Sequence, residues 1–322
     1  MTPLIEACLA LPVVRLSLEY ESDRYTFLPP NLAAKLRGAL GERLRALADG
    51  THDLAAQQAF AAARETIKSV PRAKGFGTPL FAFDTPWRPM PIGPGDPVGL
   101  QLLLMENAAL LWPCWLEALR ELQIDTGCRL VLTQCTAITG SGMYDVDDVL
   151  AAPETALCAL GAHVIPIDER PRALRIHLLT PTCWNAPTNF DPKARLAPRF
   201  LVTAVFRRLT LVADRDLSDE EKELRDLLLP SRVRIPAARA LTVTQTVRPA
   251  DSRKSYRERR GEAGDDEAWQ EYGGMMGHFD LRSHDGRPLP DVLVRALEVI
   301  QVIHLGTAIA FGCGQVFLEC LG

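Results

Sequence analysis

Hydrophobic and polar residues alternate along residues 11–20, and Val14, Leu16 and Leu18 fall on one face of this segment. The two-residue period predicts a β-strand with one buried face. After a Pro-Pro turn at residues 29 and 30, leucines recur at helical spacing from Leu32 to Leu47. That spacing predicts a helix that buries one side. Both periods recur along the chain, which predicts a protein of mixed strands and helices.

The first half of the chain has the patterns of one complete folding unit. They predict strands at residues 11–20, 79–84, 97–104 and 128–137 and helices at residues 32–47 and 108–122. Pro113 is expected in the first turn of the second helix, because proline is not tolerated in a helix interior. An alanine-rich helix at residues 54–68 is interpreted as an insertion. The remaining order, strand-helix-strand-strand-helix-strand, is that of a ferredoxin-like domain.

The second half repeats this order. It predicts strands at residues 172–179, 238–247, 273–281 and 314–320 and helices at residues 195–212, 219–229 and 289–305, with Gly306 as the cap of the last helix. We therefore expect an α+β protein with tandem ferredoxin-like (RRM-like, βαββαβ) domains and a linker near residues 138–170. The N-terminal domain would span residues 1–140, with a helical insertion at 51–70. The C-terminal domain would span residues 141–322, with a glycine-rich loop at 304–314.

Composition and charge narrow the class of protein. The chain has 322 residues, 47% of them hydrophobic, which is enough for two domains with full cores. It lacks both a run of about 20 apolar residues and a signal-peptide pattern, so a cytoplasmic protein is expected. The net charge of −4 argues against a general nucleic-acid coat. Basic residues nevertheless cluster at residues 248–260, and local clustering matters more than the sum for phosphate binding.

The eight cysteines show no C-x-x-C pair, and their spacing suits neither a zinc site nor a disulfide framework. Free Cys is among the most buried residue types, so buried free thiols are expected. No metal and no cofactor are predicted.

Several segments together resemble one family. They are LRGALGERLRAL (36–47), PLFAFDTPWRPMPIGPGD (79–96), LQLLLMENAALLWPCWLEALREL (100–122), LRIHLLTPTCWNA (174–186), FRRL (206–209) and HLGTAIAFGCGQVFLE (304–319). In this order they resemble the CRISPR-associated pre-crRNA processing endoribonucleases of the RAMP superfamily. The resemblance implies two ferredoxin-like domains that bind a CRISPR repeat RNA, often at a stem-loop. It also implies cleavage without a metal, by attack of a ribose 2′-OH on the adjacent phosphate.

Cleavage of this kind requires a group that moves a proton and a cation that neutralises the phosphate. His52 is the histidine nearest the end of the first helix and is a candidate acid or base. Arg37, on that helix, is a candidate for stabilising the transition state. By the family's layout, Arg72 and Lys74 border the cleavage site, and Tyr25 is a further catalytic candidate. These residues also have non-catalytic interpretations. His52 could be a polar loop residue, Arg37 could lie on a solvated helix face, and Tyr25 could be a turn residue.

The expected RNA-binding residues lie in two segments. The basic stretch and its flank comprise Arg248, Arg253, Lys254, Tyr256, Arg257, Arg259 and Arg260, where the tyrosine could stack on an unpaired base. The glycine-rich loop contributes Gly306, Gly312 and Gly314, because glycines let backbone N–H groups approach phosphate. The alternatives are a solvated charge run and a tight turn with close packing. His304, at the start of the loop, is interpreted as a residue that satisfies the end of the preceding helix.

The sequence thus predicts an endoribonuclease whose partner is a CRISPR repeat RNA or crRNA stem-loop, with other CRISPR effector subunits as further partners and no membrane. The first helix lacks the histidine that family members often carry there. This departure supports an alternative, a non-catalytic RAMP subunit that binds crRNA in an effector complex. A third hypothesis is an unrelated pair of ferredoxin-like domains used for protein assembly.

Overall fold

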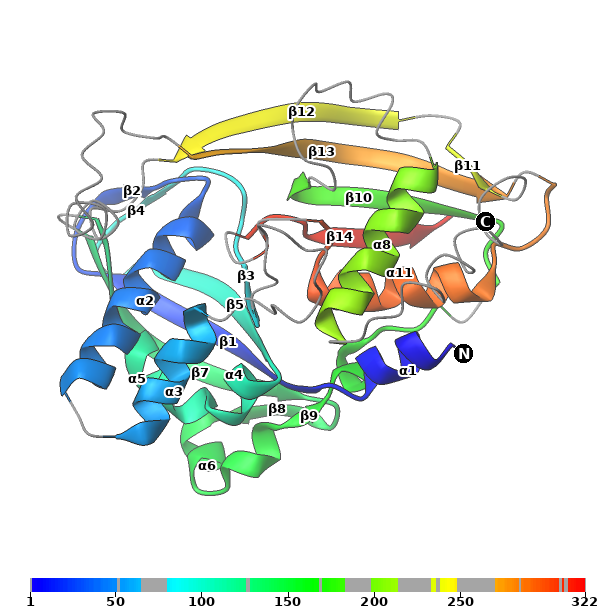
Figure 1. Ribbon diagram of the computed structural model, residues 1–322. Coiled ribbons are helices and arrows are strands. Elements are labelled where there is room, and N and C mark those ends of the chain that lie inside the picture. Colours follow the sequence, from blue (N-terminus) through cyan, green and yellow to red (C-terminus); the bar gives the residue numbers. More distant parts are fainter. Residues whose placement is uncertain are drawn as a thin grey trace, which may run out of the picture.

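A computed structural model describes residues 2–50, 53–64, 80–125, 128–167, 170–182, 198–213, 233–235, 238–247, 270–283, 285–306, 309 and 312–321. The chain folds into two halves that lie side by side, each with an antiparallel sheet and helices (Figure 1). The α+β class expected from the sequence is confirmed.

The sheet of the first half has the strand order β3-β5-β1-β7-β6, with β8 added to β7 and β9 to β1. Its strands are β1 (Pro12–Ser22), β3 (Phe81–Asp84), β5 (Pro97–Met105), β6 (Glu121–Asp125), β7 (Cys128–Thr139), β8 (Gly142–Asp145) and β9 (Cys158–Ala159). A separate two-stranded ribbon joins β2 (Thr26–Leu28) to β4 (Met90–Ile92). The four strands predicted for this half are confirmed, and β1 lies in the middle of the sheet.

The helices of the first half are α2 (Leu32–Gly50), α3 (Leu54–Arg64), α4 (Asn107–Leu110) and α5 (Trp112–Leu119). Leu36 and Leu40 of α2 are buried in one core with Leu16 of β1, as the helical period predicted. The helix predicted at residues 108–122 is wrong at its end, because residues 121 and 122 belong to β6. The predicted helix is divided at Leu111 into α4 and α5, and Pro113 lies in the first turn of α5 as predicted, where its missing N–H costs no helical hydrogen bond.

The sheet of the second half has the order β11-β13-β10-β14, and β12 also pairs with β13. Its strands are β10 (Ala173–Thr182), β11 (Val233–Arg234), β12 (Ala238–Val247), β13 (Gln270–Ser283) and β14 (Val316–Cys320). Helices α8 (Pro198–Val212) and α11 (Asp291–Ile303) pack against it, and Phe206, Ile176 and Leu297 share its core. The predicted strands and the helices near 195–212 and 289–305 are confirmed, whereas the helix predicted at 219–229 lies outside the described residues.

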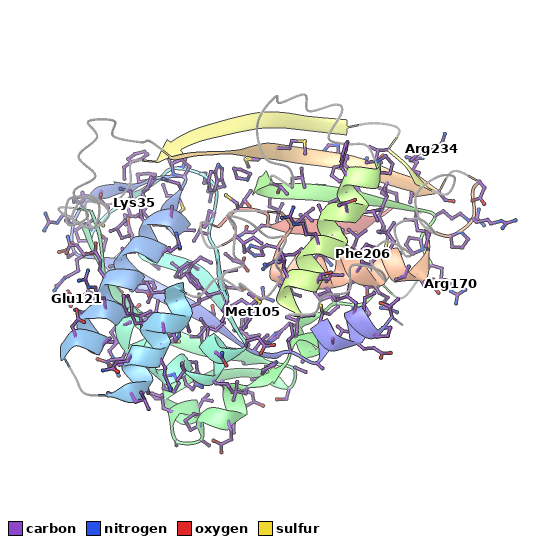
Figure 2. The ribbon with its side chains drawn as sticks, viewed as in Figure 1. Lys35, Met105, Glu121, Arg170, Phe206 and Arg234 are labelled. Carbon is purple, nitrogen blue, oxygen red and sulfur yellow. The ribbon has the colours of Figure 1, made fainter. Side chains whose placement is uncertain are left out.

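The two halves are joined by more than a linker. Helix α1 (Pro3–Leu9) precedes β1, yet Ile5 and Cys8 are buried in the core of the second half. Met105, at the end of β5, belongs to that same core together with Phe206 (Figure 2). The linker expected near residues 138–170 is corrected: it contains β8, α6 (Val146–Leu150) and β9, which pairs with β1. Strand pairing therefore continues where the sequence showed no clear period.

Within the described ranges, no helix is long and apolar enough to cross a membrane. The cysteines described there are free thiols, and Cys8, Cys128, Cys135 and Cys313 are buried as expected. Cys320 is exposed, so the prediction of buried thiols is wrong at that position. It is in phase with the buried Val316 and Leu318 but is the last residue of β14, and it is exposed at the strand end.

Candidate functional site

The glycine-rich segment reverses the chain between α11 and β14. Helix α11 ends at Ile303, and the next residue, His304, has a positive φ of 64°. The expected cap at Gly306 is therefore wrong, because the left-handed residue directly after the helix is His304 and Gly306 lies two residues further on. A non-glycine residue in this conformation costs about 1–3 kcal/mol and persists only where its surroundings fix it.

Gly312 and Gly314 are explained by close packing. Both have positive φ values, 74° and 83°. A Cβ on Gly312 would lie 2.5 Å from the Cβ of Ala33, at the start of α2, so the turn of the second half touches the first helix of the first half. The N–H of Gly312 donates to the carbonyl oxygen of Ile309, and that of Gly314 donates to the carbonyl oxygen of Pro181. These glycines thus serve a tight turn, and their contact with RNA stays a prediction.

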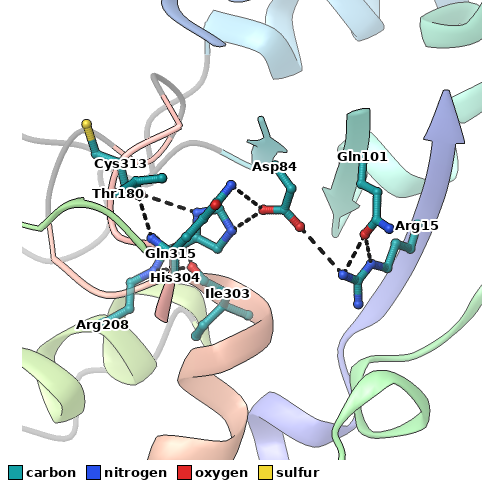
Figure 3. A network of polar contacts seen from close by, with 9 residues as sticks. All are labelled: Arg15, Asp84, Gln101, Thr180, Arg208, Ile303, His304, Cys313 and Gln315. Atoms are coloured by element: carbon teal, nitrogen blue, oxygen red, sulfur yellow. Dashed lines mark hydrogen bonds and ion pairs between the residues drawn. The ribbon is translucent and has the colours of Figure 1, made fainter. Parts of the chain in front are cut away.

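A polar network connects this turn to the other half of the molecule (Figure 3). The Nε2 atom of His304 lies 2.6 Å from Oδ1 of Asp84, the last residue of β3. Gln315 donates from Nε2 to the same oxygen at 3.1 Å. On its other side, Asp84 Oδ2 lies 3.5 Å from a guanidinium nitrogen of Arg15 in β1. The Asp84 carboxylate is therefore contacted by three side chains, one from near the N-terminus and two from near the C-terminus.

Each ring nitrogen of His304 lies beside an oxygen atom. Its Nδ1 atom is 3.3 Å from the carbonyl oxygen of Cys313, which can only accept, and its Nε2 atom faces the carboxylate of Asp84. Burial by itself raises the pKa of Asp84, but the charges and hydrogen bonds of His304, Arg15 and Gln315 outweigh it and lower that pKa. The contact thus joins a buried histidine of one half to a partly exposed carboxylate of the other.

The network is anchored on both sides. Arg15 is held by two hydrogen bonds to Oε1 of Gln101 on the neighbouring strand β5, at 3.0 and 2.7 Å. The backbone N–H of Gln315 donates to the hydroxyl of Thr180 at 2.9 Å. Arg208, from α8, donates twice to the carbonyl oxygen of Ile303 at the end of α11. His304 was expected to bond the end of α11, but Arg208 makes those hydrogen bonds instead, and the ring of His304 contacts Asp84.

Replacing Asp84 with asparagine should lower the free energy of unfolding at pH 7 by about 1–3 kcal/mol, because the buried His304 then loses a charged hydrogen-bond partner. Chemical denaturation of both proteins measures this. The pKa of Asp84 is lowered on folding, so its contribution is complete above the carboxyl's ordinary pKa and is lost as pH falls through the lowered value. The two stabilities should therefore converge in acid.

The matched control is Asp49→Asn, because the Asp49 side chain is 71% exposed and pairs with Arg45 at the surface of α2. Little change is expected there. Equal stability of Asp84→Asn and the parent protein at pH 7 would show that the ion pair does not hold the halves together.

Arg37 is a catalytic candidate on the helix that the glycine turn contacts. It lies four residues after Ala33 on α2, so the two occupy one face of the helix on successive turns. Ala33 is the residue that Gly312 contacts. Tyr25 precedes β2, and its side chain is 84% exposed, with its ring beside Gly93. The other candidates, His52, Arg72, Lys74 and the basic stretch from Arg248 to Arg260, lie outside the described residues.

Helix α2 also offers an open surface beside Arg37. Gly38 and Gly41 lie three residues apart, on one face of α2. A Cβ on either glycine would meet nothing within 4 Å in the described part of the chain. No packing within that part explains these two glycines, in contrast to Gly312 and Gly314.

No protein-family model matches the sequence, and no curated protein is significantly similar to it. Solved structures, however, share its fold. A Cas6 product complex matches with a TM-score of 0.51 at 15% identity, over 96% of this chain and 100% of that one. Thermus thermophilus Cas6 matches with a TM-score of 0.50 at 15% identity, over 96% and 99% of the two chains. The protein has a Cas6-like fold.

A partial Cas6-RT-Cas1–Cas2 complex also matches, with a TM-score of 0.51 at 13% identity, over 97% of this chain and 46% of that one.

In this Cas6-like fold, the segments that carried the family resemblance meet at the junction. Asp84 comes from the segment 79–96, and His304 and Gln315 come from the segment 304–319. Thr180 and Arg208 come from the segments 174–186 and 206–209. Asp84 and Arg15 were not predicted as site residues from the sequence. A carboxylate that ends the apolar strand FAFD was the available signal, but nothing in the sequence identified its partner.

Proposed function

We propose that the protein is a metal-independent endoribonuclease that binds CRISPR repeat RNA and cleaves precursor crRNA, and that it retains the mature crRNA. The ribose 2′-OH attacks the adjacent phosphate, which leaves a cyclic phosphate and a 5′-hydroxyl end. The observation that carries the proposal is the contact of the glycine turn with the start of α2 in a Cas6-like fold. The glycine turn lies in the segment 304–319 of the family resemblance, and the segment 36–47 of that resemblance follows Ala33 along α2.

We further propose that each half is a ferredoxin-like domain, at residues 1–140 and 141–322, with the helical segment 51–70 inserted in the first. In a βαββαβ unit, the fourth strand lies beside the first, and the third and second strands follow on the other side. The order β7-β1-β5-β3 supports this assignment for the first half, and the order β14-β10-β13-β12 supports it for the second.

Arg37 would stabilise the charge that develops on the scissile phosphate. Two features of α2 support this role. Arg37 lies one helical turn beyond Ala33, the residue that Gly312 contacts, and it is next to Gly38, where a Cβ would meet nothing within 4 Å in the described ranges. A fixed guanidinium can lower the barrier by charge stabilisation and positioning without a dedicated base. His52 and Lys74 are the proposed proton-transfer and charge-stabilising partners, with Arg72 beside them and Tyr25 as a further catalytic candidate. These assignments rest on the resemblance alone.

The RNA itself would be held along the basic stretch. Arg248, Arg253, Lys254, Arg257, Arg259 and Arg260 would neutralise phosphates, Tyr256 would stack on an unpaired base, and the turn at Gly306, Gly312 and Gly314 would contact the backbone. The match to a Cas6 product complex supports RNA as the ligand class. A stem-loop in the repeat and other CRISPR subunits are the partners that the proposal implies.

Cleavage of a cognate repeat RNA in the presence of EDTA tests the proposed activity. We expect full activity without divalent metal, and products that end in a 2′,3′-cyclic phosphate and a 5′-hydroxyl. A repeat with a 2′-deoxy nucleotide at the scissile position is the matched control and should bind without being cut. Activity that EDTA abolishes would contradict the proposed mechanism.

The second candidate is a non-catalytic subunit that binds crRNA in an effector complex. One observation favours it: α2 contains no histidine, and His304 is only 2% exposed and is engaged with Asp84. A buried, paired histidine is a poor general acid or base. Tight binding of a mature crRNA together with no cleavage of any cognate repeat would select this candidate.

A further inference from the structure

The second sheet has one face that is not packed against α8 and α11. Along its strands, Ile176, Phe279 and Leu318 are buried in the core with these helices. Successive side chains in a strand point to opposite faces, so the residues between them face the other way. His177, His278 and Phe317 are such residues, on β10, β13 and β14.

These three residues form a row of rings across adjacent strands. His177 is the cross-strand partner of His278 on one side and of Phe317 on the other. The ring centroids of His177 and His278 are 5.6 Å apart, and those of His177 and Phe317 are 5.8 Å apart. Phe317 is 53% exposed, and Leu179, two residues beyond His177 on β10, is 50% exposed. The row thus has one exposed ring, Phe317, beside two half-buried histidine rings, and the exposed Leu179 lies next to it on β10.

Charged side chains occupy the next row of the same face. Arg175 pairs with Asp280 at 2.8 Å, and Arg282 contacts the same carboxylate at 3.3 Å. Hydrogen bonding from Arg175 is the main reason why the pKa of Asp280 is lowered, so this aspartate stays ionised. Glu319 is hydrogen-bonded to Nε2 of His177 at 2.8 Å. Arg175 also lies 3.9 Å from Glu319, so two guanidinium groups are shared between two carboxylates beside the rings, and Glu319 contacts both His177 and Arg175.

We propose that this face binds unpaired nucleotides of RNA. His177, His278 and Phe317 stack against bases, and Arg175 and Arg282 neutralise phosphates. Rings on an antiparallel sheet flanked by arginines are suited to unstacked bases, because each base offers a flat face and each linkage offers a charge. A duplex hides its base faces and does not fit such a row. The inference rests on the proposed function, since it assigns a surface for the single-stranded part of the same RNA.

Fluorescence anisotropy with a labelled, unstructured uridine-rich RNA and the full-length protein tests the proposal. Phe317→Ala is expected to weaken binding about tenfold, as removal of one stacking ring does. Phe317→Trp should restore binding, because it keeps an aromatic face. Ile165→Ala is the control, since Ile165 is an apolar side chain that is 78% exposed on a loop, and it should leave binding unchanged. Glu319→Gln should strengthen binding, because it removes the negative charge beside the rings.

Two outcomes overturn the proposal: unchanged affinity in Phe317→Ala, or equal affinity of the parent protein for a duplex of the same length. Cleavage of a repeat stem-loop without flanks is measured separately. If cleavage occurs and Phe317→Ala binds the unpaired RNA normally, this inference fails and the proposed function stands. If no repeat is cleaved but affinity for the unpaired RNA depends on Phe317, the inference stands and the enzymatic function fails.

Discussion

Replacing Gly314 with alanine is expected to lower the free energy of unfolding by about 3–5 kcal/mol, or to prevent folding. The φ of Gly314 is 83°, a region that costs a side-chain-bearing residue about 1–3 kcal/mol. A Cβ would also overlap the carbonyl oxygen of Leu305. That oxygen belongs to the backbone, and the N–H of Leu305 is itself bonded to the carbonyl oxygen of Gly314 at 2.8 Å. No side-chain rotation can relieve the overlap.

Gly41→Ala is the matched control for this substitution. Gly41 lies within α2, and a Cβ there would meet nothing within 4 Å in the described ranges. Alanine should therefore stabilise the protein by about 0.5–1 kcal/mol, since glycine weakens a helix interior. Chemical denaturation followed by circular dichroism compares the two variants. A Gly314→Ala protein as stable as the parent would mean that the turn is not held as tightly as these contacts indicate.

Replacing Arg37 with alanine is expected to slow single-turnover cleavage of a repeat RNA about 100-fold, with affinity for the RNA mostly kept. Removing one preorganised group that stabilises transition-state charge costs a factor of this order. The expectation follows from the proposed function and from the position of Arg37, one helical turn beyond Ala33, which Gly312 contacts. Single-turnover rates and dissociation constants, measured at one salt concentration, separate the two effects.

Arg43→Ala provides the control on the same helix. Arg43 is exposed, and six residues of helix turn it away from the side of Arg37. It should change neither the rate nor the affinity by more than a small factor. A loss of affinity without a slower chemical step would instead give Arg37 a binding role. Unchanged cleavage in Arg37→Ala would remove it from the site.

Local periodicity was sufficient to predict most of the elements. The alternation at residues 11–20 predicted β1, and the leucine spacing predicted α2, because each pattern records which side of one element is buried. The same reasoning failed at residues 121 and 122. There, Leu122 continues the apolar pattern of α5, but residues 121 and 122 pair with β7 and belong to β6. The competing interaction is pairing with another strand, and the spacing of apolar residues within one segment carries no information about that pairing.

The glycines show the same limit. Sequence reasoning identified Gly312 and Gly314 as positions where a side chain is not tolerated. Only the tertiary structure showed what excludes it: Ala33 in one case and the backbone of Leu305 in the other. The positions could be predicted because glycine is conformationally distinct, whereas the neighbour could not be predicted because it lies on a distant segment.

The sequence by itself thus determined the α+β class, most strands and helices, and the segments that carry the family resemblance. Only the tertiary structure decided how those segments meet: Asp84 contacts His304 across 220 positions, and α1 is buried in the core of the second half. The physical reason is the distance along the chain over which each interaction acts. Burial patterns and backbone preferences act within a few residues, whereas an ion pair or a shared core depends on how whole sheets and helices are placed.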